Sequence, residues 1–285
     1  MIFTRSPLNY LGNKYKILPN ILEILPNNIN VFVDLFGGSG TVCLNVHAEH
    51  IIYNDIVFQI KDILYGIKII ENFDVLHDKI KNVINEYHLD GYNEFGFKKL
   101  REDYNAGKKK DWWYLYVLIC YSFNSQFRFN SKLEYNSSFG KRDAITEKTY
   151  NKLRESYNKL KTLDIIFTSK SFEEFDFSDF DKNDLVYLDP PYYGTTANYN
   201  DGKRGFKGWD YSLEMKLREL CVELNNKNIK FVLSNNLSVN TTLEEWTNKN
   251  GFIIHEIPNI TYESCNYQKK KTKKDREVLM CNYIK

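Results

Sequence analysis

The chain has 285 residues, of which 42% are hydrophobic and 27% charged, and its formal net charge is only +2. This length allows one large α/β domain or two modest ones, and the apolar content excludes a globally disordered chain. The five cysteines are scattered and form no CxxC pair, which argues against both a disulfide framework and a metal site.

The first elements of the chain follow an α/β pattern. A predicted strand at 30–35 runs into the turn Phe36-Gly37-Gly38-Ser39-Gly40, and the apolar spacing of 42–46 then predicts a helix. A second strand at 50–53 ends on Asn54-Asp55. Small residues at such a turn let a ligand approach the backbone, and an acid after the second strand can bind ribose hydroxyls. A tight turn and a helix N-cap are the alternative interpretations.

Residues 56–161 have a different, mostly helical pattern. The apolar run 112–121 predicts a buried helix, because it is too short to span a bilayer. The alternation of aromatic and polar residues over 123–142 predicts an exposed hairpin. The α/β pattern then returns, with strands expected at 164–168, 185–188, 230–233, 252–257 and 277–284 and helices at 211–225 and 241–249. We therefore expect one α/β domain, 1–55 with 162–285, interrupted by the insertion 56–161.

Asp189-Pro190-Pro191-Tyr192 follows the apolar strand 185–188 and is the strongest chemical signal in the sequence. Ligands of doubly wound sheets bind at the carboxyl ends of strands. Methylation of an exocyclic amine requires acceptors for its hydrogens, which a carboxylate and a carbonyl in a rigid proline turn can supply. An aromatic residue beside them can stack on an extruded base. The alternative interpretation is an ordinary turn after a strand.

Taken together, these motifs resemble those of the Dam-like, or D12 class, DNA adenine-N6 methyltransferases, over nearly the whole chain. The resemblance implies a Rossmann-like S-adenosylmethionine-dependent methyltransferase sheet with helices on both faces and an inserted helical and β-hairpin target-recognition domain. It implies that Asp189, Pro190, Pro191 and Tyr192 are catalytic. The cofactor-binding residues that it implies are Tyr10, Lys14, Phe36, Gly37, Gly38, Gly40, Asp55, Phe172 and Asp189. Ser234-Asn235-Asn236 is similar to the family's Ser-Asn strand end.

The hairpin 123–142 resembles the family's target-recognition hairpin. By this resemblance Phe123 and Asn124 approach the base step beside the target, and Arg128 reads a guanine edge, with a phosphate contact as the alternative. Further DNA contacts are expected from Asn130, Lys141, Arg142 and Lys270. Ser137-Ser138 stands where GATC-specific members commonly have Val-Pro, so GATC is not implied. The opening Tyr10–Lys14 motif looks closer to a branch that includes fused type IIS methyltransferases.

The resemblance implies S-adenosyl-L-methionine as cofactor, S-adenosyl-L-homocysteine as product, no metal, and double-stranded DNA as substrate. It also points to a cognate restriction endonuclease as functional partner. We expect a monomer or weak dimer in the cytoplasm of a bacterial or phage-infected cell, since the N-terminus has no signal-peptide core. The rival interpretations are an amino methyltransferase acting on RNA, cytosine N4 or protein, and a non-catalytic DNA-binding relative. A nicotinamide dehydrogenase would leave the Asp-Pro-Pro-Tyr motif unexplained.

Overall fold

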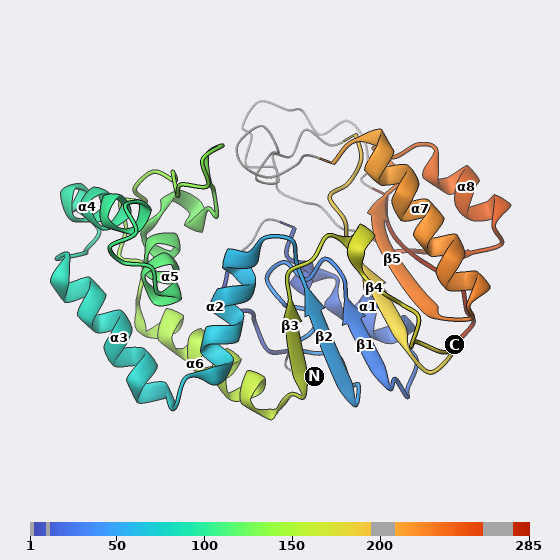
Figure 1. The fold of residues 1–285 in the computed structure, drawn as a ribbon, viewed down its shortest axis with the longest axis horizontal. Coiled ribbons are helices and arrows are strands. Elements are labelled where there is room, and N and C mark those ends of the chain that lie inside the picture. Colours follow the sequence, from blue (N-terminus) through green and yellow to red (C-terminus); the bar gives the residue numbers. More distant parts are fainter. Residues whose placement is uncertain (1–2, 10–11, 195–208, 259–275) are drawn as a thin grey trace.

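A twisted sheet forms the centre of the computed structural model, which describes residues 3–9, 12–194, 209–258 and 276–285 (Figure 1). In this part of the chain the sheet has seven strands in the order β3-β2-β1-β4-β5-β7-β6. The strands are β1 (Val31–Asp34), β2 (His50–Asn54), β3 (Ile165–Thr168), β4 (Leu185–Leu188), β5 (Lys230–Asn236), β6 (Ile253–Glu256) and β7 (Glu277–Cys281). Each predicted strand is present, within a few residues of its expected bounds.

Strand direction and order define the ligand-binding edge of the sheet. The strands from β3 to β5 pair in parallel, whereas β7 runs antiparallel to both β5 and β6. The chain leaves β1 for β2 on one side and returns to β4 on the other, so the strand order reverses between β1 and β4. Such a reversal opens a crevice beyond the carboxyl ends of the strands. The expected Rossmann-like arrangement is confirmed.

Successive side chains of each central strand point to opposite faces of the sheet and enter two separate hydrophobic cores. On one face, Phe32 and Tyr187 pack with α1 (Leu18–Ile24) and α2 (Phe58–Ile69). On the other face, Val33 and Val186 pack with α7 (Tyr211–Asn226) and α8 (Leu243–Lys249). The sheet is therefore covered by helices on both faces, as the sequence predicted. Among the described residues, no helix combines the length and apolarity that crossing a bilayer would require.

The segment between β2 and β3 forms a helical lobe beside the β3 edge of the sheet (Figure 1). It contains α2, α3 (Phe73–Glu86), α4 (Glu94–Asn105), α5 (Trp112–Tyr121), η2 (Phe123–Ser125) and α6 (Glu147–Thr162). The apolar α5 lies at its centre and packs against α2, α3 and α4. Because α2 also packs on β3, one hydrophobic core continues from the sheet into the lobe. The division at residues 56–161 remains a prediction.

The prediction of a helix after the glycine turn is wrong. Residues 41–45 form consecutive turns, with backbone bonds from Leu44 to Gly40 and from Asn45 to Val42. The Asn45 side chain donates to Thr41 O at 2.8 Å and to Thr4 O at 2.9 Å, so it takes a carbonyl that a continuing helix would use. Asparagine side chains compete with helix hydrogen bonds in this way.

The hairpin prediction is confirmed only in outline. Two isolated antiparallel bridges, Ser122 with Phe139 and Phe129 with Tyr135, join its two arms in place of regular strands. The aromatic residues on one side of the alternation, Phe127, Phe129, Tyr135 and Phe139, are buried in the core rather than exposed. The alternation therefore separates a buried face from a polar face, as in any strand that covers a core.

Candidate active site

A pocket opens at the carboxyl ends of β1, β2 and β4, where the strand order reverses. Most of the predicted site residues line it, namely Lys14, Phe36, Gly37, Gly38, Asp55, Phe172, Asp189, Pro190 and Pro191. They come from η1 (Lys14–Lys16), the ends of three strands and η3 (Phe172–Glu174). Tyr10, which was expected here, lies outside the described residues. The structure thus brings together residues that are far apart in the sequence.

The glycine turn is held against β2 by its own backbone. Tyr53 donates its phenol proton to Gly38 O at 2.6 Å, and Gly38 N donates to Asp55 Oδ2 at 2.8 Å. A Cβ on Gly37 would lie 2.3 Å from the Tyr53 ring, so only glycine allows this packing. Gly40 has φ +73°, a conformation that also favours glycine, and it is not among the pocket-lining residues. Gly40 therefore shapes the turn.

Asp55 is a buried acceptor on the pocket wall. Its Oδ1 accepts a hydrogen bond from Val57 N and its Oδ2 accepts one from Gly38 N, both at 2.8 Å. Burial raises the pKa of its carboxyl to about 6, and the two backbone bonds only partly oppose that effect. Because Val57, and not Asp55, occupies the N-cap position of α2, the N-cap alternative for Asp55 does not apply. Its carboxylate instead braces the glycine turn while facing the pocket.

We expect ligand binding at Asp55 to depend on pH. The carboxylate is the better acceptor for hydroxyl groups, and it is lost as the pH falls through the raised pKa of about 6. For S-adenosylhomocysteine, the product that the family resemblance implies, the dissociation constant should therefore rise about tenfold on going from pH 8 to one unit below that pKa. Isothermal titration calorimetry across this range tests the expectation. The Asp55→Asn variant should bind weakly at every pH, and a persistent step near pH 6 in this variant would assign the titration to another group.

Lys14 and Asp189 form an ion pair in the wall of the pocket. Lys14 Nζ lies 2.7 Å from Asp189 Oδ1, and the two side chains are 7% and 16% exposed. Burial raises the pKa of the Asp189 carboxyl above its ordinary value, and the neighbouring lysine partly counteracts the rise. The pair stands directly at the end of β4, where the chain turns through Pro190 and Pro191. Its low exposure strengthens the interaction between the two charges.

Tyr192 is fixed at both its ring and its hydroxyl. The hydroxyl donates to the buried Glu277 carboxylate and lies 3.2 Å from Ser234 Oγ. The ring faces the Lys14 ammonium, which lies 5.1 Å from its centroid. Burial raises the pKa of the Tyr192 phenol well above its ordinary value, so the hydroxyl stays protonated. Sequence reasoning missed Glu277, whose signal was an acid opening the otherwise apolar strand β7.

Asp34 is a second buried acid at the edge of the pocket, at the end of β1. Its side chain is almost fully buried and accepts the Cys43 thiol proton at 3.2 Å. Burial raises the pKa of this carboxyl to about 7, with nearby Asp189 and Asp55 adding to the rise. Ionisation of Asp34 therefore opposes folding.

We expect the Asp34→Asn variant to be more stable than the parent, by clearly more at pH 8 than at pH 5. A folded-state pKa of about 7 means that Asp34 stabilises the fold less as the pH rises from 3.8 through 7. Above pH 7 the ionised Asp34 lowers the free energy of unfolding of the parent by at most about 4 kcal/mol. Urea unfolding at both pH values measures the difference. The exposed Asp179→Asn variant is the control, and a gain at pH 5 as large as at pH 8 would contradict the titration.

All the predicted DNA-binding residues except Lys270 lie on the hairpin 123–142. Phe123 is 51% exposed and Asn124 has φ 52°, which places both at a sharp turn after α5. Arg128 is exposed on the polar face of the hairpin, and Lys141 is also exposed.

Two other predicted DNA contacts are engaged within the protein. Arg142 Nη2 donates to Ser125 Oγ at 2.5 Å. The Asn130 side chain donates to Glu134 at 2.7 Å and accepts from two backbone amides, so it organises the hairpin turn. Lys270 lies outside the described residues. All the DNA contacts remain predictions.

Comparison with known proteins places the chain among methyltransferases. The model of the D12 class N6 adenine-specific DNA methyltransferases matches residues 10–262. Modification methylase StsI of Streptococcus sanguinis is 40% identical over 291 residues, which are 99% of this chain and 43% of that protein. Type II methyltransferase M.FokI of Planomicrobium okeanokoites is 42% identical over 287 residues, with coverage of 99% and 43%. DNA adenine methylase of Haemophilus influenzae is 26% identical over 244 residues, with coverage of 81% and 79%. The chain therefore spans less than half of the first two relatives.

Proposed function

The chain belongs to the D12 class N6 adenine-specific DNA methyltransferases, and from this membership we propose that it transfers a methyl group from S-adenosylmethionine to N6 of an adenine in duplex DNA. The observation that carries the proposal is the Asp189 carboxylate, held by Lys14 at 2.7 Å where the pocket meets the Asp-Pro-Pro-Tyr turn. A carboxylate in this position is the acceptor that an aromatic amine needs in order to become a nucleophile.

The side chains of the pocket suit the proposed cofactor from end to end. Phe36 and Phe172, with ring centroids 5.5 Å apart, provide an apolar wall for an adenine ring. The carboxylate of Asp55 suits ribose hydroxyls, and the Lys14–Asp189 pair suits the charged amino-acid end. When bound, S-adenosylmethionine supplies an electrophilic methyl group on a sulfonium sulfur. The presence of aromatic rings, an acid and an ion pair in one pocket supports this assignment.

Asp189 and the rigid proline turn would position the reacting nitrogen. Lys14 occupies Asp189 Oδ1, which leaves Oδ2 to accept a hydrogen bond from the adenine amino group. The two prolines restrict the backbone, so that the Pro190 carbonyl can serve as a second acceptor. Two acceptors draw the nitrogen lone pair out of conjugation with the ring, which is a form of electrostatic preorganisation. No covalent intermediate with the protein is required.

Tyr192 would stack on the target base once that base has left the duplex. Bases that undergo chemistry must leave the stack, at a cost of a few kcal/mol. A ring held by Glu277 and Ser234 loses little freedom when a base stacks on it. The exposed Arg128 and Lys141 on the hairpin would contact the flanking duplex. We also propose that the protein acts as a modification enzyme beside a cognate restriction endonuclease, and as a monomer or weak dimer.

Methyl transfer from labelled S-adenosylmethionine to mixed-sequence duplex DNA tests the proposal. Nucleoside analysis should find the label in N6-methyladenine, and methylation-sensitive sequencing should place it at one fixed motif. RNA and protein are offered as competing acceptors in the same assay. Label confined to either of them, with none in DNA, would overturn the proposed substrate.

A further inference from the structure

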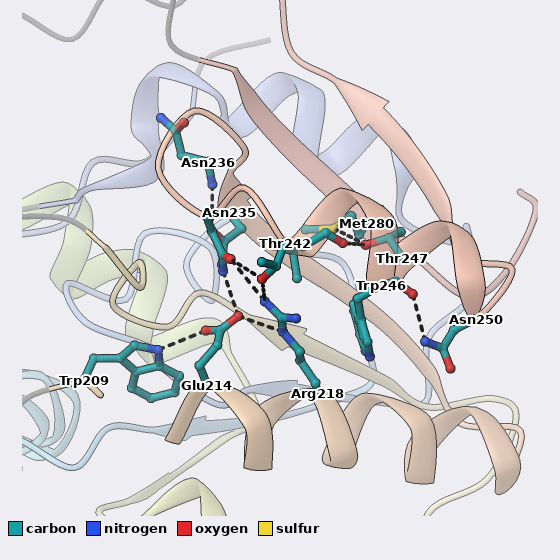
Figure 2. A network of polar contacts seen from close by, with 12 residues as sticks. Trp209, Glu214, Arg218, Asn235, Asn236, Thr242, Trp246, Thr247, Asn250 and Met280 are labelled. Atoms are coloured by element: carbon teal, nitrogen blue, oxygen red, sulfur yellow. Dashed lines mark hydrogen bonds and ion pairs between the residues drawn. The ribbon is translucent and has the colours of Figure 1, made fainter. Parts of the chain in front are cut away.

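A buried polar network that includes Glu214 and Arg218 lies on the α7 side of the sheet (Figure 2). Glu214 and Arg218 of α7 are 0% and 6% exposed, and Asn240, in the loop after β5, is 1% exposed. Taking an acid and a base out of water is costly unless hydrogen bonds compensate for the lost hydration. A network of this kind in a methyltransferase sheet calls for a structural or functional reason.

Glu214 uses both carboxylate oxygens within this network. Oε1 accepts Arg218 Nε at 3.1 Å and Asn240 Nδ2 at 2.7 Å. Arg218 Nη2 in turn donates to Asn240 Oδ1 at 3.1 Å and to Thr242 at 2.9 Å. The remaining oxygen, Oε2, accepts the indole N–H of Trp209 at 3.1 Å. The network therefore fixes the carboxylate oxygen to which the Trp209 indole N–H donates.

Trp209 lines the pocket at its aromatic end. Its ring centroid lies 5.7 Å from that of Phe36, nearly perpendicular to it, and 5.6 Å from that of Phe172. The three rings thus contact one another and form one continuous apolar surface. Figure 2 shows the indole N–H directed toward Glu214. The face of the ring is therefore left for the pocket, while its polar atom is satisfied inside the protein.

We propose that Trp209 is a direct contact for the adenine of the cofactor, and that Glu214, held by Arg218 and Asn240, is the residue that positions it. This inference rests on the proposed use of S-adenosylmethionine. A fixed indole presents a stacking surface without losing rotational freedom on binding, which increases affinity. The buried ion pair thereby contributes conformational specificity to the pocket, a role attested for buried polar groups.

Binding of S-adenosylhomocysteine, measured by calorimetry and by tryptophan fluorescence, tests the contact. The chain has four tryptophans, and stacking of adenine on Trp209 should quench its emission. The quench should persist in Trp113→Phe, whose ring packs on Trp112 and Tyr114 outside the pocket, and vanish in Trp209→Phe. Trp209→Ala should weaken binding about tenfold, as expected for loss of one aromatic stacking partner. Unchanged affinity in Trp209→Ala, or a quench that survives in Trp209→Phe, would overturn the contact.

A double-mutant cycle separates positioning by Glu214 from a general loss of stability. Glu214→Gln replaces a carboxylate oxygen with an amide N–H, which then faces one of the three groups that donate to Glu214. We therefore expect the dissociation constant of the cofactor to rise several-fold, and KM for the cofactor to rise more than kcat falls. In the Trp209→Phe background, which has no indole N–H to position, the same substitution should have little further effect. Additive effects would overturn the positioning role. If the parent protein itself fails to bind S-adenosylhomocysteine, both this inference and the proposed function are wrong. If the parent binds it and the Trp209 variants bind it equally well, only this inference is wrong.

Discussion

Replacing Asp189 with alanine is expected to reduce methyl transfer to duplex DNA by at least about 1,000-fold, while the sheet stays folded. The substitution removes the carboxylate that would accept the adenine amino hydrogens. Asp189→Asn should lie between the parent and Asp189→Ala, because an amide oxygen still accepts one hydrogen bond. Single-turnover rates with a duplex containing the recognition motif measure the ranking.

The Lys14–Asp189 ion pair determines the controls for this experiment. Because Lys14 is 7% exposed, removing its partner leaves a poorly solvated charge, and Asp189→Ala should lose some thermal stability. Far-ultraviolet circular dichroism and DNA binding should nevertheless match those of the parent. The exposed Asp179→Ala variant controls for loss of an acid as such. A folded Asp189→Ala protein with more than about a tenth of parental activity would exclude Asp189 as the acceptor.

Replacing Arg128 with alanine is expected to lower kcat/KM on the recognition motif by roughly 5- to 150-fold, equivalent to about 1–3 kcal/mol of base discrimination. Arg128 is exposed on the polar face of the hairpin, opposite the buried rings of Phe127 and Phe129. Its planar guanidinium can read a guanine edge through two hydrogen bonds. Removing it should relax the sequence preference at one position of the motif. Sequencing of methylated mixed-sequence DNA would show that relaxation.

The alternative role of Arg128, a phosphate contact, makes a different prediction. Loss of a phosphate contact would weaken binding to every sequence alike and reduce the salt dependence of binding by about one charge. Lys132→Ala, on the exposed turn of the same hairpin, is the matched control because it removes a charge without a bidentate group. If Arg128→Ala and Lys132→Ala lose affinity uniformly and keep the same motif preference, Arg128 does not read a base.

The sequence alone was sufficient to predict the strands, the helix 112–121 and the place of the Asp-Pro-Pro-Tyr motif, because all of these depend on local patterns. An apolar run of four to eight residues that ends at a polar or glycine-rich turn can be recognised without knowledge of the rest of the chain. The helix predicted at 42–46 is the informative exception. There the Asn45 side chain bonds to Thr41 O and Thr4 O, and the second of these contacts reaches far along the chain.

Only the tertiary structure decided which distant residues meet and how their chemistry changes. Lys14 joins Asp189, Tyr192 joins Glu277, and Glu214 joins Asn240, because the parallel strands and the loop after β5 converge at one edge of the sheet. Burial at that edge raises the pKa of Asp34 to about 7 and that of Asp55 to about 6, which no local motif encodes. Residue types and spacings therefore determined the kind of chemistry, whereas desolvation and long-range contacts determined which groups can perform it and in which charge state.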